Sequence, residues 1–171
     1  MMRRPFTPRR DGSLDASLST TEAEAVRQVA SDVLHELDET ADPGLKRLFP
    51  PAYTDDAPAD EEFQGLTRDD LIARKRGTAK AVLQSIDTGK SKRGSWSARL
   101  DEETANAWLA LVNDARLILG TRLDVTEEME PEPLASSDPQ AHQYNLYLYL
   151  GALESELVDA LMVGLPEGSS D

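Results

Sequence analysis

The sequence of 171 residues lacks cysteine, is poor in aromatic residues and has no long apolar run. Without cysteine, the chain cannot form disulfides, thiolate metal sites or thiol redox centres. Aromatic residues make up 5% of the chain, so we expect a core that is mainly aliphatic. No apolar run approaches the roughly 20 residues of a membrane-spanning helix. Residues 1–10 are basic but precede polar residues instead of the apolar segment of a signal peptide. These absences favour a cytoplasmic protein that makes no membrane contact.

Residues that commonly perform catalysis are also scarce. The two histidines, His35 and His142, are not in a metal-binding spacing, and His35 falls on the polar side of a predicted helix. Residues 89–91 read Gly-Lys-Ser, but Gln84 stands where a phosphate-binding loop needs its first glycine. A calcium site would need a turn glycine and regular spacing, which are missing from the acidic cluster Glu127, Glu128, Glu130 and Glu132. We therefore predict a protein that is not an enzyme and that holds no cofactor or metal.

The formal net charge of −14 disfavours nonspecific binding to nucleic acid, which is itself a polyanion. The cations are nevertheless clustered, since half of the Lys and Arg residues lie within residues 68–99 and none follows Arg122. Either the molecule is electrically polarised, or its basic and acidic segments pack together. No helix-turn-helix pattern accompanies the cluster, so we expect any contact with DNA to be indirect. The candidate contacts to nucleic acid or to a protein partner are Arg74, Arg76, Lys80, Lys90, Lys92, Arg93 and Arg99.

In the first half of the chain, the pattern predicts a hairpin at residues 6–18, with a type I′ turn at Asp11 and Gly12. A helix is predicted at 22–39, opened by a capping box of Thr21 and Glu24. Residues 42–44 break it, and 45–49 suggest a short helical turn. Residues 52–64 read as a loop with one helical turn at 60–63. The next helix is expected at 68–87, capped by Thr67 and Asp70, and residues 89–91 read as a flexible turn.

In the second half, alternating residues predict a strand at 95–100, and Asp101 then caps a helix that ends at Gly120. Residues 124–138 form an acidic linker or loop, and a last helix is expected at 140–162. The predicted fold class is mainly α (α+β). It is a single helical domain over residues 1–171, with frayed ends at 1–5 and 164–171. Four main helices surround the aliphatic core, with a small antiparallel sheet made by the N-terminal hairpin and the central strand.

The two strand-then-helix segments have a similar layout. Gly12, Leu14, Ala16 and Leu18 match, at one constant offset, Gly94, Trp96, Ala98 and Leu100. Such similarity indicates two copies of one unit related by a pseudo-twofold axis, with their strands in one sheet. The match is weak in identity, and a chance resemblance of two strands before two capped helices stays an alternative.

Several polar residues fall in apolar arcs. Arg116 and Glu154 are predicted to pair across the helix interface as a structural ion pair, although such a pair could also line an enzyme pocket. Lys75 needs a carboxylate partner or must reach water along its stem. Three tyrosines lie on different sides of the last helix, so at least one should be at a protein interface: Tyr144, Tyr147 and Tyr149.

Four segments carry a family resemblance: 48–53, 66–71, 113–123 with Trp108 and Leu109 before it, and 150–151. Together they resemble an actinobacterial family, long catalogued as a domain of unknown function, that includes an oxidative-stress transcriptional regulator. The resemblance implies a small transcription regulator that works with a stress sigma factor or RNA polymerase to promote a sulfur-assimilation operon after oxidation. It also implies oxidant sensing through a cysteine pair, which this chain lacks. Either this member regulates without a thiol switch, or the family shares a more general adaptor role. A homodimer is left open.

Overall fold

The computed structural model describes residues 4–38 and 48–163, which form four helices and one four-stranded antiparallel sheet. This confirms the predicted mainly helical (α+β) fold class. The elements in chain order are β1 (Phe6–Pro8), β2 (Leu14–Ser19), α1 (Thr20–Glu36), α2 (Ala57–Thr88), β3 (Lys90–Lys92), β4 (Ser95–Leu100), α3 (Glu102–Arg122) and α4 (Ala141–Val163). The predicted break at 42–44, the turn at 45–47 and the frayed ends at 1–3 and 164–171 lie outside the described residues.

The sheet has the strand order β1-β2-β4-β3. Each hairpin therefore places its second strand at the centre of the sheet and its first strand at an edge. At the centre, Ala16 of β2 lies opposite Ala98 of β4. These are matching positions of the sequence repeat, and the two helix N-caps, Ser19 and Asp101, also match. This arrangement is the one expected for two copies of a hairpin-then-helix unit related by a pseudo-twofold axis through the two alanines.

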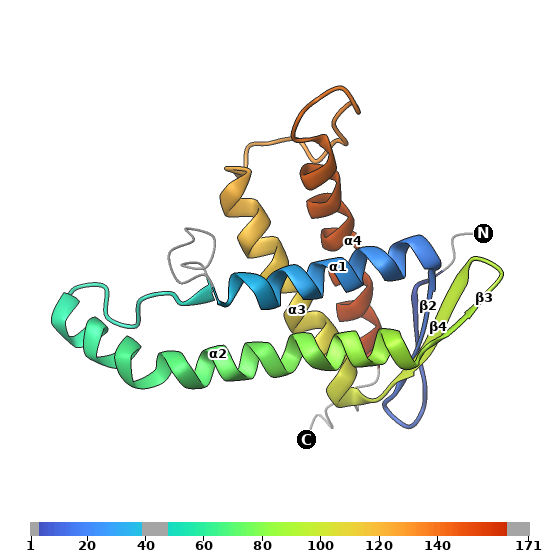
Figure 1. Cartoon of the computed structure of the whole chain (residues 1–171), viewed down its shortest axis with the longest axis horizontal. Coiled ribbons are helices and arrows are strands. Elements are labelled where there is room, and N and C mark those ends of the chain that lie inside the picture. The colour runs from blue at the N-terminus through green and yellow to red at the C-terminus, as the bar shows by residue number, and fades with distance from the viewer. Residues whose placement is uncertain (1–3, 39–47, 164–171) are drawn as a thin grey trace, which may run out of the picture.

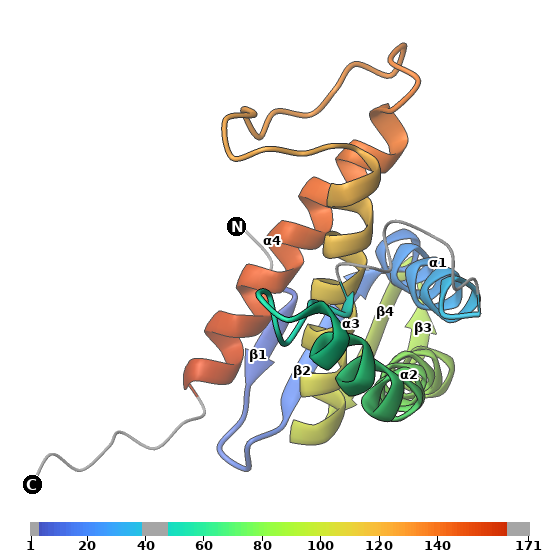
Figure 2. The same cartoon turned by 90° about the vertical axis from the view of Figure 1, so that its left-hand side faces the viewer.

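The helices lie on one side of the sheet, as α1 and α2 run side by side across α3 and α4 (Figure 1). In Figure 2, α1 and α2 are seen end-on beside the sheet, and α3 and α4 run next to each other. The centre of the core lies where α3 meets the sheet. Trp108 of α3 is fully buried there, between the rings of Phe6 and Trp96. Its ring centroid is 6.0 Å from that of Phe6 and 5.8 Å from that of Trp96. The aliphatic core predicted from composition therefore has a small aromatic centre.

Helix α2 is longer than predicted, because it begins at Ala57 and not at residue 68. The side chain of Asp56 accepts from the backbone N–H of Ala59, and Pro58 occupies the first turn, where a missing N–H does no harm. Thr67 lies inside the helix and donates its hydroxyl to the carbonyl of Phe63. The predicted loop is confirmed at 52–56, but its continuation to residue 64 and the cap at Thr67 were wrong, because a second, valid cap lies eleven residues earlier at Asp56.

Other helix ends also shift. Helix α1 is capped by Ser19 and Glu22, which form the capping box that the sequence placed at Thr21 and Glu24. It ends at Glu36, before the expected residue 39. Helix α3 continues two residues beyond Gly120 to Arg122, because Gly120 is packed within the helix and the chain turns later, at Asp124, with a φ of 51°.

The segment read as a flexible turn is instead strand β3, which pairs with the first half of β4 and adds a fourth strand to the sheet. The type I′ turn predicted for the first hairpin is also wrong. Only Gly12 has a positive φ in the first hairpin, whereas Arg93 and Gly94 both do, at 50° and 77°. The type I′ pattern predicted for Asp11 and Gly12 is thus found in the second hairpin. Within residues 4–38 and 48–163, none of the helices is apolar enough over a sufficient length to span a membrane.

Candidate interaction site

The β3–β4 hairpin lies at one end of the molecule (Figure 1). Three of its cationic side chains are exposed. Two lie on the edge strand β3 and the third in the turn, where two successive residues with positive φ favour a well-defined hairpin. All three are exposed and form no ion pair within the part of the chain that the structure describes. They are called the hairpin cations below: Lys90, Lys92 and Arg93.

The neighbouring cation Arg99 is partly neutralised. Its guanidinium lies 3.7 Å from the carboxylate of Asp15, which also accepts from Arg9 at 2.7 Å. The hydrogen bond from Arg9 keeps the pKa of Asp15 below its usual range. Arg99 therefore belongs to a local charge cluster and contributes less free positive charge than the hairpin cations do.

The remaining predicted contacts lie along α2. Arg76 pairs with Asp38 at the end of α1, whereas Arg74 and Lys80 are exposed and have no ion pair in the described residues. At 1.5 Å per residue, Arg74 lies about 20 Å along the helix axis from the end of α2. The seven cations predicted together from the sequence consequently do not form one patch.

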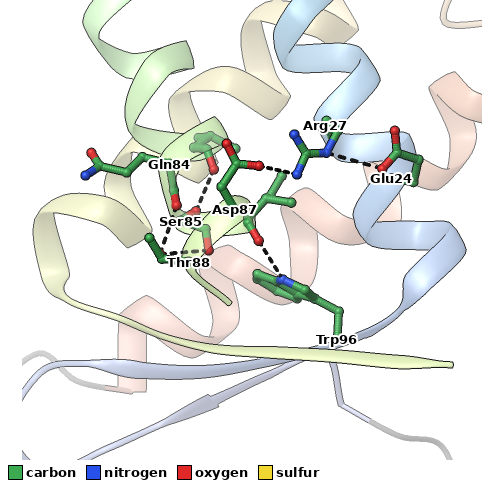
Figure 3. A network of polar contacts seen from close by, with 9 residues as sticks. Glu24, Arg27, Gln84, Ser85, Asp87, Thr88 and Trp96 are labelled. Carbon is green, nitrogen blue, oxygen red and sulfur yellow. Dashed lines mark hydrogen bonds and ion pairs between the residues drawn. The ribbon is translucent and has the colours of Figure 1, made fainter. Parts of the chain in front are cut away.

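A polar network joins the hairpin to the end of α2 (Figure 3). The indole N–H of Trp96 donates to the carbonyl of Ile86 at 3.0 Å. The indole N–H of Trp108 donates to the hydroxyl of Ser85 at 2.9 Å, and this hydroxyl donates to the carbonyl of Val82. Both indole rings are buried, so these bonds give their N–H groups partners that burial would otherwise deny them.

Two further contacts fix the same junction. Arg27 of α1 pairs with Asp87 near the end of α2, and also with Glu24 at 3.2 Å (Figure 3). A methyl group added at Gly89 would lie 2.2 Å from Nε1 of Trp96, so glycine is required for the ring to approach the chain. The sequence predicted a turn at Gly89 and a strand that contains Trp96, but it did not predict the contact between these two residues.

A groove of about 850 Å³ lies beside this junction. It is lined by residues of α2, of the strands β2, β3 and β4, and of the start of α3, including Gln84, Thr88, Lys90, Ser97, Arg99 and Asp101. Hydroxyl and amide groups there can exchange hydrogen bonds with a partner, and Lys90 lies at its border. Lys90 thus links the hairpin cations to a polar groove that offers hydrogen bonds to a partner segment.

Helix α3 is tied to each of the other helices by an ion pair. Lys75 of α2 contacts Asp114 at 3.0 Å, so this lysine has a carboxylate partner. Arg122 contacts Glu36 of α1 at 2.6 Å. Asp114 is 7% exposed, and burial raises its pKa despite the nearby lysine. These pairs fix how the helices pack on α3.

The third pair joins Arg116 of α3 to Glu154 of α4. The guanidinium carbon also lies 5.1 Å from the ring centroid of Tyr147. A methyl group at Gly151 would lie 3.4 Å from the same guanidinium, so the Arg116 side chain packs against this part of α4. These are the contacts of a partly buried ion pair between the two helices.

All three tyrosines of α4 make contacts within the molecule. Tyr144 is buried and donates its hydroxyl to the carbonyl of Glu130 at 3.0 Å. Tyr147 stacks on Tyr144, with ring centroids 6.3 Å apart. Tyr149 packs against the core, where burial and then the charge of Glu22 raise its pKa. They do not gather into one exposed surface.

Comparison with known proteins identifies the relatives of this chain. Residues 2–161 match the family described as Domain of unknown function (DUF2017). Proteins named oxidative stress regulator AosR, from Mycobacterium bovis and Mycobacterium tuberculosis, are 29% identical over 164 residues, covering 88% of this chain and 72% of each relative. An AosR homologue of Mycobacterium leprae is 31% identical over 134 residues, covering 71% of this chain and 59% of the relative. No solved structure matches the chain. Because the family match spans nearly its whole length, this protein belongs to the DUF2017 family and is similar to the mycobacterial AosR regulators.

Proposed function

We propose that this chain is a non-enzymatic regulatory protein that acts in the cytoplasm by contacting the transcription machinery, through a sigma factor or an RNA polymerase subunit. The names of its relatives support a role in regulation under oxidative stress. The observation that carries the proposal of a protein contact is the set of hairpin cations, which are exposed and without ion pairs among the described residues.

The charge of the whole chain explains why this surface matters. At a net charge of −14, most of the molecule repels acidic partners, and an unpaired cationic hairpin is a place where attraction exceeds that repulsion. The junction of Trp96 and Gly89 holds the hairpin in place before any partner arrives. A preorganised surface loses less conformational entropy on binding, so modest contacts give useful affinity.

This member regulates without a cysteine switch, because the chain has no cysteine. An oxidant signal would then reach it through its partner or through a change in its own abundance. Its contact with the partner should be the same before and after treatment of the purified chain with a thiol-specific oxidant.

The test is affinity purification of the tagged chain from its own cells. Wild type is compared with a hairpin variant in which all three cations are reversed: Lys90→Glu, Lys92→Glu and Arg93→Glu. The control reverses two exposed cations of α2, Arg74→Glu and Lys80→Glu. We expect sigma factor or polymerase subunits with wild type and control, and about tenfold less with the hairpin variant, which equals about 1.4 kcal/mol. Purification of wild type without such subunits would refute the proposal.

A second candidate is direct binding of nucleic acid by the same hairpin. Lys90 is paired in register with Ser97, so an ammonium group and a hydroxyl lie side by side on the sheet, a combination that contacts phosphates in other proteins. Binding of this kind weakens steeply with salt. A gel shift at low salt that disappears in the hairpin variant and at physiological salt would favour it, and the absence of any shift would exclude it.

A further inference from the structure

The first half of α2 is a helix without a buried side chain. None of residues 57–70 is buried, and the buried residues of this helix, Ala79, Val82 and Ile86, all lie toward its other end. Figure 1 shows this half extending beyond α1 and α3. Short helices are marginal in water by themselves, and most helical stability in proteins comes from packing of an apolar face.

The preceding segment partly stabilises this half. The carboxylate of Asp60 accepts from the backbone N–H groups of Ala52 and Tyr53, at 2.7 and 3.3 Å. The side chain of Gln64 donates to the carbonyl of Pro50 at 3.1 Å. Residues 50–56 thus run along the helix, and residues 50–70 together form a projecting unit that we call the arm.

The arm exposes an apolar patch. Leu66 is 75% exposed, Tyr53 51% and Phe63 40%. The rings of Tyr53 and Phe63 meet edge to face with centroids 6.2 Å apart, and Phe63 and Leu66 share a helix face at i, i+3 spacing. These three residues are called the arm patch. Apolar side chains gathered on a projecting element indicate a surface that is covered in a complex.

Carboxylates border the arm patch. The side chains one turn before and after Leu66 are Glu62, Asp69 and Asp70, all exposed and without an ion pair among the described residues. The cation Arg68 on this stretch is directed elsewhere, with its guanidinium carbon 5.2 Å from the centroid of the Phe49 ring. The patch is therefore apolar at its centre and negative at its rim.

We propose that the arm patch is a docking site for an amphipathic helix of a protein partner, in which an apolar stripe is flanked by lysine or arginine. The apolar stripe would cover Phe63 and Leu66, and the basic residues would meet the carboxylates at the rim. Two copies of this chain facing each other at this patch would bring like charges together, and an anionic membrane would be repelled by the same carboxylates.

This site goes beyond the proposed function, because it is separate from the hairpin. The arm and the hairpin lie at opposite ends of α2, which at 1.5 Å per residue is about 48 Å long (Figure 1). The chain could therefore hold an acidic partner surface at one end and a basic helix at the other. Loss of one contact would leave the other intact, so the two proposals fail separately.

The test measures binding of a synthetic helical peptide to the full chain by fluorescence anisotropy at physiological salt. The probe has about 18 residues, with leucines at i, i+3, i+4 and i+7 and lysines beside them. A matched peptide carries glutamate in place of lysine. We expect the lysine peptide to bind, the glutamate peptide to bind at least tenfold more weakly, and Leu66→Ala and Phe63→Ala to weaken the lysine peptide about tenfold.

Two control variants separate the arm patch from general attraction to an acidic protein. Val158→Ala shortens an apolar side chain of α4 that is 40% exposed. A loop variant removes four charges: Glu127→Gln, Glu128→Gln, Glu130→Gln and Glu132→Gln. Both controls should bind the lysine peptide within about twofold of wild type, since neither touches the arm.

Three results would overturn the proposal. The first is a lysine peptide that does not bind wild type. The second is equal binding by wild type and by the two arm variants, or a loss in the loop variant as large as theirs. The third is a dimer of the chain in light scattering that Leu66→Ala dissociates, which would assign the patch to a second copy of this chain.

Discussion

The indole N–H of Trp96 donates to the carbonyl of Ile86 across 3.0 Å, at the point where α2 ends and the second hairpin begins. This one bond joins a strand residue of the second repeat to the last turn of the preceding helix. Gly89, which leaves space for the ring, lies between them in the chain. The hairpin cations are thereby presented from a fixed base instead of a flexible turn.

Gly89→Ala should destabilise the protein by about 1–3 kcal/mol, because the added methyl group would collide with the Trp96 ring at 2.2 Å. Gly77→Ala is the matched control, since nothing lies within 4 Å of its added methyl group and alanine favours a helix by up to about 1 kcal/mol. Urea unfolding monitored by tryptophan fluorescence measures both. Equal stability of the two variants would show that the Trp96 contact is not tight.

The cap of α1 can be located by two alanine substitutions. Ser19→Ala should cost about 1 kcal/mol, because the Ser19 hydroxyl accepts from the backbone N–H of Glu22 at 3.1 Å. Thr21→Ala should change the free energy of unfolding by less than about 0.5 kcal/mol, since Thr21 is exposed and does not cap the helix. If Thr21→Ala lowered the thermal stability more than Ser19→Ala did, the cap would lie at Thr21, as the sequence suggested.

Local signals in the sequence identified the helices, the β4 strand and the N-cap Asp101, because each depends on residues close together in the chain. The start of α2 was missed for a physical reason. Two segments within 56–70 have capping residues, and only the contacts of residues 50–53 with Asp60 and Gln64 decide that the helix starts at the first. These contacts join residues that are not neighbours in the chain, and the periodicity of apolar residues within a helix does not predict such contacts.

The candidate site was predictable only in part. The cluster of cations at 68–99 is plain in the sequence, but the division between hairpin cations and α2 cations depends on strand β3, whose residues are all polar. Alternation of apolar and polar residues, which revealed β4, is absent from such an edge strand. The pairing of Lys75 with Asp114 was likewise hidden, since Asp114 gave no signal of burial.

The Lys75–Asp114 pair should show strong coupling. Asp114→Ala should cost about 2–3 kcal/mol, because it leaves the lysine without its partner, although the lysine side chain is 20% exposed and water can offset part of the penalty. The double variant Lys75→Met, Asp114→Leu should recover most of that loss. A double-mutant cycle from urea unfolding that gives a coupling near zero would mean that the pair contributes nothing to helix packing.

The same carboxylate should impose a pH dependence. Burial raises the pKa of Asp114, so the native state keeps this proton to a higher pH than the unfolded chain does. The stability from this group is therefore fully present below the unfolded pKa of about 3.9 and is lost as pH rises through the folded value. In unfolding experiments between about pH 3 and pH 7, wild type should lose stability relative to Asp114→Asn as pH rises. A gain relative to the variant would contradict the raised pKa.

Direct titration of the purified chain against RNA polymerase holoenzymes, each carrying one sigma factor of its own host, tests the proposed regulatory contact. At least one holoenzyme should bind wild type, and reversal of the hairpin cations should weaken that binding about tenfold, or about 1.4 kcal/mol. Reversal of Arg74 and Lys80 should leave it within about twofold, because these cations lie on α2 away from the hairpin. Equal affinity of wild type and the hairpin variant for the bound holoenzyme would contradict a contact through the hairpin.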